Sequence, residues 1–364
     1  MTANSDVVVH LDRITKRFGE VVAVDDLDMQ IIAGEFITFL GPSGCGKSTT
    51  LRMIAGLEEV TSGTIEVDGQ DIVGTPARDR DIAMVFENYA LYPHLSVFDN
   101  IAMPLVARRT AKAEIYDRVE RIAKRMGISE HLRNRPAKLS GGQRQRVALA
   151  RAMVRTPKMF LMDEPLGHLE EYMRVDLRRE IRALHEATGG TTFYITHDQE
   201  EAAAVSDRIA VMSDGELLQV GTMQDLIKRP VNRFVAEFVG EPPISIFDDI
   251  SVTNGKLLLG GSTVTLPAPL QAASEVQAPI SAGVRPEHFT VAEPDADGLA
   301  AIAQSVQPMG EWGAVLCETP AGPATAIAAS TDLPAEGDRI KLLPAPEHVH
   351  LFAADGRNLL ASEA

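Results

Sequence analysis

The first 240 residues alternate between short apolar runs and longer stretches with helical spacing. Residues 35–40, 158–164 and 193–196 each form a short, mostly apolar segment. Runs of this length without polar alternation are typical of strands buried on both faces, as in a parallel sheet covered by helices. Residues 112–126 and 143–155 have the composition of helices. The pattern predicts an α/β fold.

A different pattern begins near residues 238–243, where Gly240, Pro242 and Pro243 interrupt the chain. Beyond them lie short alternating runs such as 256–259 and 262–266, separated by Gly and Pro turns. This pattern is typical of an all-β unit and predicts a small barrel. We therefore expect two domains, residues 1–240 and 241–364, with a helical subdomain at about 88–157 in the first.

A glycine-rich loop follows the strand at 35–40 and precedes a helical segment at 49–55. Residues 41–48 fit the pattern G-x-x-x-x-G-K-S. Glycines let backbone N–H groups surround phosphates, and the following helix adds positive potential. A plain glycine turn would not need Lys and Ser at these offsets. The predicted ATP-binding residues here are Ser43, Gly44, Cys45, Gly46, Lys47, Ser48 and Thr49.

Two acidic residues end the apolar run at 158–164. Asp163 and Glu164 would lie at the carboxyl edge of a parallel sheet, beside the phosphate loop. Asp163 suits a Mg²⁺ site together with Ser48, and Glu164 suits the general base that orients the attacking water. Adjacent acids after a strand can also serve as a helix N-cap, but the phosphate loop favours chemistry.

His197 ends the run at 193–196 and precedes a polar helix start. A single histidine at a strand end is more often structural than catalytic. Here, however, its imidazole N–H could contact a γ-phosphate as charge develops.

A second phosphate-binding element lies at residues 139–143. Ser140 is a good N-cap, Gly141 and Gly142 permit close approach, and the helix beginning at Gln143 has its N-terminus open to an anion. These residues could also merely cap a helix. Two phosphate-binding elements in one chain predict a protein that acts as a pair.

In this order the motifs resemble the ATP-binding cassette (ABC) ATPases, and among them the ATPase subunits of maltose-type carbohydrate importers. The resemblance covers nearly the whole chain and implies a RecA-like core with a helical subdomain, followed by an OB-like (TOBE-type) regulatory domain. Phe18 matches the family's adenine-stacking aromatic, residues 139–143 its signature, and His197 its switch histidine. Residues 283–288 match the motif of the C-terminal domain, which either mainly dimerises or senses a solute or regulator.

The resemblance also implies the partners. ATP on one subunit would be covered by Ser140, Gly141, Gly142 and Gln143 of a second ATPase subunit in a head-to-tail dimer. Two transmembrane permease subunits and, indirectly, an extracytoplasmic solute-binding protein would complete an importer of a sugar, polyol, glycerol or glycerol phosphate. The candidate membrane-subunit contacts are Tyr89, Leu91, Tyr92 and His94, each of which could instead be a core residue of the helical subdomain.

Two positions depart from the family pattern. Glu87 stands where the family has a Gln that bridges Mg²⁺ and the attacking water; a carboxylate can ligate Mg²⁺ but cannot donate a hydrogen bond. Residues 166–170 read Leu-Gly-His-Leu-Glu instead of Leu-Ser-Asn-Leu-Asp, so Glu170 is one methylene longer. The partner could therefore be a different chain, and a weakly hydrolysing regulatory subunit of a heterodimer is the alternative function.

Charge and composition exclude other classes. The net charge is −5 for residues 1–240 and −11 for 241–364, so nucleic acid is not an expected partner. The chain has no apolar run of bilayer length and no signal peptide, which predicts a soluble, cytoplasmic protein. The resemblance implies that it is peripheral to the cytoplasmic face of the inner membrane. Its two cysteines, Cys45 and Cys317, do not suggest a disulfide framework.

Overall fold

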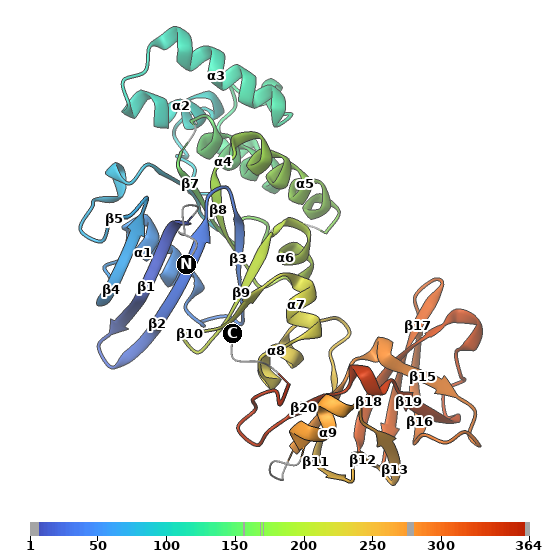
Figure 1. The fold of residues 1–364 in the computed structure, drawn as a ribbon. Helices are drawn as coiled ribbons and strands as arrows, with labels where there is room; N and C mark the ends of the chain where they lie inside the picture. Colours follow the sequence, from blue (N-terminus) through green and yellow to red (C-terminus); the bar gives the residue numbers. More distant parts are fainter. Residues whose placement is uncertain (1–6, 156, 168, 170, 275–279, 361–364) are drawn as a thin grey trace. The chain divides into compact units, whose positions relative to one another are not determined.

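The structure is a computed structural model that describes residues 7–155, 157–167, 169, 171–274 and 280–360. The chain folds into two compact units, residues 1–223 and 224–364 (Figure 1).

A six-stranded sheet with the order β10-β9-β3-β8-β7-β6 forms the centre of the first unit. Five strands run parallel, and β10 pairs antiparallel with β9 at one edge. The strands are β3 (Phe36–Leu40), β6 (Ile82–Val85), β7 (Met159–Asp163), β8 (Thr191–Thr196), β9 (Arg208–Ser213) and β10 (Glu216–Gly221). The parallel sheet predicted from the apolar runs is confirmed.

Both faces of this sheet are buried. Phe36, Phe160 and Tyr194 pack into one hydrophobic cluster with helical residues such as Ile101 and Leu149. Their neighbours on the same strands, including Ile37 and Phe193, belong to a second cluster on the opposite face. The alternation of side chains along a strand explains why almost every residue of these strands is apolar.

A four-stranded antiparallel sheet packs over the second cluster, in the order β2-β1-β4-β5. Its strands are β1 (Val7–Phe18), β2 (Val21–Ile32), β4 (Ser62–Val67) and β5 (Gln70–Asp71). Ala23 and Val24 of β2 lie against the phosphate loop, because a Cβ added to Gly46 would sit 2.4 Å from the Ala23 carbonyl oxygen.

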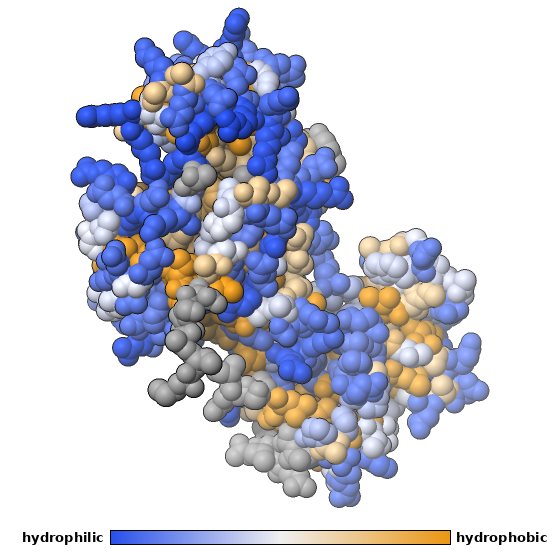
Figure 2. All heavy atoms as spheres, turned by 45° about the horizontal axis from the view of Figure 1, so that its top comes forward, coloured by the Kyte–Doolittle hydropathy of each residue, from blue (hydrophilic) through white to orange (hydrophobic). Residues whose placement is uncertain are grey.

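The described residues of the first unit also form the helices α1 (Lys47–Ala55), α2 (Val97–Ala107), α3 (Lys112–Arg125), α4 (Gly141–Met153), α5 (Glu171–Thr188) and α6 (Gln199–Val205). In Figure 1, α2 and α3 lie together at one end, next to α4. Within α3, Ile115, Val119 and Ala123 are buried at helical spacing. The remaining α3 positions are mainly charged, and Figure 2 shows this end of the unit covered largely by hydrophilic side chains.

The second unit holds two antiparallel sheets, in the orders β13-β12-β11-β14-β20 and β15-β19-β16-β17-β18. Their strands are β11 (Ser245–Thr253), β12 (Lys256–Leu259), β13 (Ser262–Thr265), β14 (Ile280–Val284), β15 (Phe289–Ala292), β16 (Leu299–Pro308), β17 (Trp312–Thr319), β18 (Gly322–Ala329), β19 (Arg339–Pro344) and β20 (His350–Phe352). The short helices are α7 (Met223–Lys228), α8 (Arg233–Phe238) and α9 (Ala268–Ser274). The predicted all-β character of this region is confirmed.

The division between the compact units falls at residue 223, earlier than the change of sequence pattern near residue 240. Arg285, which is 2% exposed, gives the physical reason. Its guanidinium donates to the Val239 carbonyl at 2.8 Å and to the Ile227 carbonyl at 3.2 Å. These bonds attach the segment that contains α7 and α8 to the end of β14. The segment therefore belongs to the second unit, although its sequence has a helical pattern like that of the first unit.

Three histidines gather near the end of β14. The rings of His288 and His348 stack with centroids 3.7 Å apart and planes 7° apart. Burial lowers the pKa of the nearby His350 imidazole to about 4, and the positive charges of Arg285, His288 and His348 act in the same direction. Burial and His348 likewise lower the pKa of His288.

We therefore expect the second unit to lose stability in mild acid. The folded-state pKa of His350 lies below its ordinary value of 6.5, so the folded state binds fewer protons than the unfolded state. The contribution of His350 to the free energy of unfolding is complete above about pH 6.5. It decreases by up to about 3 kcal/mol as the pH falls toward 4. Trp312, the single tryptophan, reports unfolding of this unit. Its fluorescence should show a smaller loss of melting temperature between pH 7.5 and 5 in His350→Gln than in the wild type. An equal loss would contradict the assignment.

Within the residues that the structure describes, no helix has both the length and the apolar composition needed to cross a membrane.

Candidate active site

The phosphate loop has the strand, loop and helix context that its sequence predicts. It joins β3 to α1, and Gly44 and Gly46 adopt positive φ angles of 85° and 103°. A Cβ at Gly41 would lie 2.2 Å from the Met212 carbonyl oxygen. Glycine is therefore favoured at Gly44 by backbone conformation, required at Gly41 by close packing, and required at Gly46 by both.

Lys47 and Ser48 begin α1 and face different partners. Lys47 is 5% exposed, and its ammonium donates to the carbonyls of Gly41 and Pro42, each at 2.8 Å. The Ser48 hydroxyl donates to Asp163 Oδ1 at 2.8 Å. Two oxygen groups separated by 115 residues thus meet at the carboxyl end of β7. Oxygen donors of this kind are the ligands that Mg²⁺ prefers.

Three carboxylates influence one another beside Ser48. Burial raises the pKa of the Asp163 carboxyl, and the charges of Glu164 and Glu87 raise it further. The Ser48 hydroxyl and Arg52 act in the opposite direction. The site therefore has an excess of negative charge, which a divalent cation would offset.

Glu164 and His197 form the next pair. His197 Nδ1 lies 3.1 Å from Glu164 Oε2, and the Glu164 backbone N–H donates to the Ile195 carbonyl at 3.1 Å. Glu164 has a φ of 43°, uncommon for a residue with a side chain and often associated with function. The strand ends of β7 and β8 thus bring together the two residues expected to be catalytic.

The turn that carries His197 is fixed by residues that sequence reasoning did not single out. Asp198 caps α6 by accepting from the Glu201 N–H at 3.0 Å, and it pairs with Arg174 of α5 at 3.1 Å. The Glu201 carboxylate accepts from the hydroxyls of Tyr194 at 3.1 Å and Thr196 at 2.8 Å. The Asp at the N-cap position could have been predicted from the sequence, whereas its partner Arg174 on α5 could not.

The signature residues form the start of α4. Ser140 is the N-cap, and it makes a complete capping box with Gln143. The Gln143 side-chain nitrogen also lies 3.0 Å from His131 Nε2. Ser140 is exposed, while Gly142 is buried against Met173, whose Sδ would lie 3.0 Å from an added Cβ. The predicted N-cap is present, and α4 begins at Gly141 rather than at Gln143.

Phe18 is the last residue of β1 and pairs with Val21 of β2. It is 48% exposed, and the Lys16 ammonium lies 4.7 Å from its ring centroid. A large aromatic ring this exposed is unusual for a core residue and is suited to stacking on a base. It comes from the same hairpin that packs against Gly46.

In the aromatic loop after β6, some residues are buried in the core and others are exposed at the surface. Tyr89 is 8% exposed and belongs to the first hydrophobic cluster, the alternative that the sequence left open. Leu91 packs against the same cluster. Tyr92 is 43% exposed and His94 is exposed, with ring centroids 6.3 Å apart. Arg151 fixes the loop by donating to the carbonyls of Tyr89 and Ala90 at 2.8 and 2.7 Å.

A surface hollow of about 810 Å³ lies beside this loop. Its lining combines apolar side chains from the loop and α2 with several arginines and Asp79. The residues that line it include Phe86, Ala90, Tyr92, Met103, Pro104, Ala107, Arg108, Arg151 and Arg155. Of the four predicted contact residues, Tyr92 lines this hollow.

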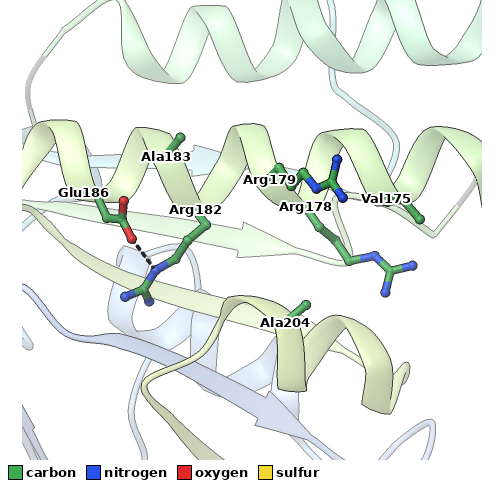
Figure 3. Close-up of a pocket in the computed structure, with 7 residues that line it drawn as sticks. All are labelled: Val175, Arg178, Arg179, Arg182, Ala183, Glu186 and Ala204. Carbon is green, nitrogen blue, oxygen red and sulfur yellow. Dashed lines mark hydrogen bonds and ion pairs between the residues drawn. The ribbon is translucent and has the colours of Figure 1, made fainter.

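A second hollow of about 340 Å³ lies between α5 and α6 and contains no predicted site residue (Figure 3). Figure 3 shows Arg178, Arg179 and Arg182 along α5. Arg182 pairs with Glu186 at 3.0 Å and Asp207 at 2.9 Å, and Asp207 also accepts from the Phe36 N–H at 2.8 Å. These contacts attach α5 to the start of β3, so this hollow is best explained as structural.

Two of the noted departures from the family pattern, His168 and Glu170, lie outside the described residues.

Comparison with known proteins agrees with this geometry. Residues 24–167 match the family model described as ABC transporter, and residues 282–352 match that of the TOBE domain. The chain is 43% identical, over 91% of its length and 93% of the relative, to the diacetylchitobiose uptake system ATP-binding protein MsiK of Streptomyces coelicolor. It is 40% identical, over 94% of its length and 96% of the relative, to the sn-glycerol-3-phosphate import ATP-binding protein UgpC of Paracoccus denitrificans.

A solved structure is also similar: the dimeric post-hydrolysis state of the ATP-binding cassette MJ0796 bound to ADP and Pi. It has a TM-score of 0.54 and 31% identity, and the match covers 59% of this chain and 98% of that one. These similarities extend from the phosphate loop to the C-terminal β-unit. The chain therefore belongs to the ABC transporter family, as an ATP-binding subunit with a nucleotide-hydrolysing cassette and a TOBE domain.

Proposed function

We propose that this chain is the ATP-hydrolysing subunit of an importer for a carbohydrate-like solute, such as a sugar, polyol, glycerol or glycerol phosphate. The observation that carries the proposal is the meeting of Ser48 with Asp163 at 2.8 Å and of Glu164 with His197 at 3.1 Å, beside the phosphate loop. The solute class is supported by relatives named for the uptake of diacetylchitobiose and of glycerol 3-phosphate.

Mg²⁺ fits the oxygen groups of Ser48, Asp163 and Glu87. When bound, it would neutralise charge on the phosphates and help orient them. Burial is the main cause of the raised pKa of Asp163, with smaller contributions from the charges of Glu164 and Glu87, and a bound cation would offset both effects.

Glu164 is proposed as the general base that orients and deprotonates the attacking water. Lys47 would contact the outer phosphates, and Phe18 would stack on the adenine. His197 would contact the γ-phosphate through Nε2, because its Nδ1 faces the Glu164 carboxylate at 3.1 Å. The carboxylate thus also positions the imidazole.

The functional form is proposed to be a head-to-tail dimer in which the exposed Ser140 and the N-terminus of α4 contact ATP held by a partner subunit. The capping box engages the N–H groups of Ser140 and Gln143 and fixes this helix end, so Gly141 and Gly142 would supply the backbone N–H groups that contact an anion. The similar cassette was solved as a dimer with ADP and Pi. We propose a second copy of this chain as the partner; turnover only in the presence of a different ATPase chain would indicate a heterodimer.

The permease is proposed to contact the hollow beside Tyr92, whose mixture of apolar and basic lining residues suits an amphipathic segment. Leu91 and His94 would lie at its edge. With two permease subunits and an external solute-binding protein, the chain would act at the cytoplasmic face of the membrane.

The alternative of a weakly hydrolysing regulatory subunit is not supported, because the catalytic groups are assembled and the relatives are named uptake or import ATP-binding proteins. Steady-state ATP turnover, with and without co-purified partners, tests this function; no turnover in any complex would contradict it.

Glu87→Gln should weaken the binding of Mg²⁺ at this site, so that turnover requires more Mg²⁺. The amide retains one oxygen ligand but loses the negative charge that acts on Asp163. At an effective dielectric constant of about 20, this change corresponds to roughly 1 kcal/mol or more, and we expect the Mg²⁺ concentration for half-maximal turnover to rise about fivefold. Glu311→Gln, an exposed acid of the second unit, is the matched control. An unchanged Mg²⁺ requirement would remove Glu87 from the metal site.

A further inference from the structure

The antiparallel sheet of the first unit has one apolar and one polar face. On β1, Val9 and Leu11 are fully buried, while His10 and Asp12 between and after them are partly exposed. Because side chains alternate along a strand, His10 and Asp12 lie on the same outward face.

The two neighbouring strands add carboxylates around His10. On β4, Glu66 pairs directly with His10, and its Oε2 lies 3.9 Å from the imidazole Nδ1. On β2, Asp28 Oδ1 lies 3.5 Å from Nε2. Both ring nitrogens therefore face a carboxylate, each from a different strand.

The side chains of His10, Asp12 and Asp28 lie close to one another. One ligand atom from each lies within 4.8 Å of the others. Donors at about 2.0 to 2.2 Å from a metal ion lie roughly 3 to 3.5 Å apart, so small side-chain rotations would close the set. The strand ladders hold the backbone in place, so little ordering is required for binding.

Charge favours a cation here. Asp12, Asp28 and Glu66 surround a single imidazole, and Arg13, whose side chain is 70% exposed, lies 3.4 Å from Asp12 Oδ1. An imidazole nitrogen with carboxylate oxygens is a donor set suited to Zn²⁺ and related divalent transition metals, whereas the proposed Mg²⁺ site offers oxygen donors alone.

We propose that His10, Asp12 and Asp28 form a binding site for a divalent transition metal, with Zn²⁺ the best fit, on the outer face of β1 and β2. His10 binds through Nε2, the nitrogen that faces Asp28. Glu66, whose Oε2 lies 3.9 Å from Nδ1, would move closer on binding to accept the Nδ1 proton and orient the ring, as carboxylates commonly do behind metal-bound histidines. The bound ion would link β1 to β2 and stabilise the hairpin that ends in Phe18.

The test is calorimetric titration of the purified full chain with ZnCl₂, in the presence of excess Mg²⁺ to saturate the oxygen-donor site. The wild type should bind one Zn²⁺ at the sheet, with a rise in melting temperature. His10→Gln and Asp28→Asn should each weaken this binding by at least about tenfold, and Glu66→Gln by about tenfold. His94→Gln and Asp295→Asn, both at exposed positions elsewhere, are matched controls and should bind like the wild type.

A readout on the unmodified chain avoids dependence on variant folding. The ring resonances of His10 in a ¹H–¹³C spectrum should shift with the first equivalent of Zn²⁺. Equal Zn²⁺ affinity in the wild type, His10→Gln and Asp28→Asn would overturn the proposal, as would first-equivalent shifts confined to other histidines or absence of binding at millimolar Zn²⁺.

Discussion

Replacing Glu164 by Gln should lower the rate of ATP hydrolysis by at least about a hundredfold, the scale typical of a lost general base. Gln has nearly the same shape and can still contact His197, but it cannot accept the proton of the attacking water. The positive φ of Glu164 places its side chain at the end of β7, next to Asp163. The measurement is steady-state phosphate release at saturating ATP.

ATP binding serves as the control for that experiment. Because Glu164 is assigned to hydrolysis rather than to phosphate contact, the variant should bind ATP as well as the wild type. Glu311→Gln should retain full turnover. If Glu164→Gln kept more than half of the wild-type rate, another group would have to be the base.

Lys47→Ala should weaken ATP binding by about a hundredfold, or about 3 kcal/mol, because a charge-assisted contact with the outer phosphates is lost. In this structure the buried ammonium donates to two carbonyls of its own loop, which shows that it can reach across the loop. Titration with ATP measures the effect, and Lys112→Ala, on the exposed face of α3, is the matched control. Wild-type affinity in Lys47→Ala would contradict the assigned contact.

The parts of the site that could be predicted from sequence are those set by local spacing. The phosphate loop, the acids after β7 and the Ser140 N-cap each depend on a few consecutive residues, and the structure places them in the expected strand and helix contexts. The parallel sheet could be predicted from the sequence because strands that are buried on both faces contain few polar residues.

The rest depends on contacts between distant segments. Tyr89 and Tyr92 belong to one aromatic loop, yet only Tyr92 lines the hollow, because Arg151 of α4 binds the carbonyls of Tyr89 and Ala90 and fixes the turn. The pairing of Arg174 with Asp198 likewise joins α5 to the His197 turn. The division of the chain at residue 223 follows from Arg285, more than 40 residues after the carbonyls that it binds.

The central claim is that Ser140 completes an ATP site on a partner subunit, and a mixing experiment tests it most directly. Lys47→Ala damages the phosphate loop, and Ser140→Arg blocks the signature, so each variant alone should have almost no turnover. In a head-to-tail dimer of one copy of each, both defects fall on the same site and the other site is intact.

Co-expression of the two variants in equal amounts should therefore restore turnover, up to about a quarter of the wild-type rate for random pairing with independently acting sites. Melting temperatures of the purified variants check that both are folded. If the co-expressed pair formed dimers but showed no more turnover than either variant alone, Ser140 would not act on a partner's ATP.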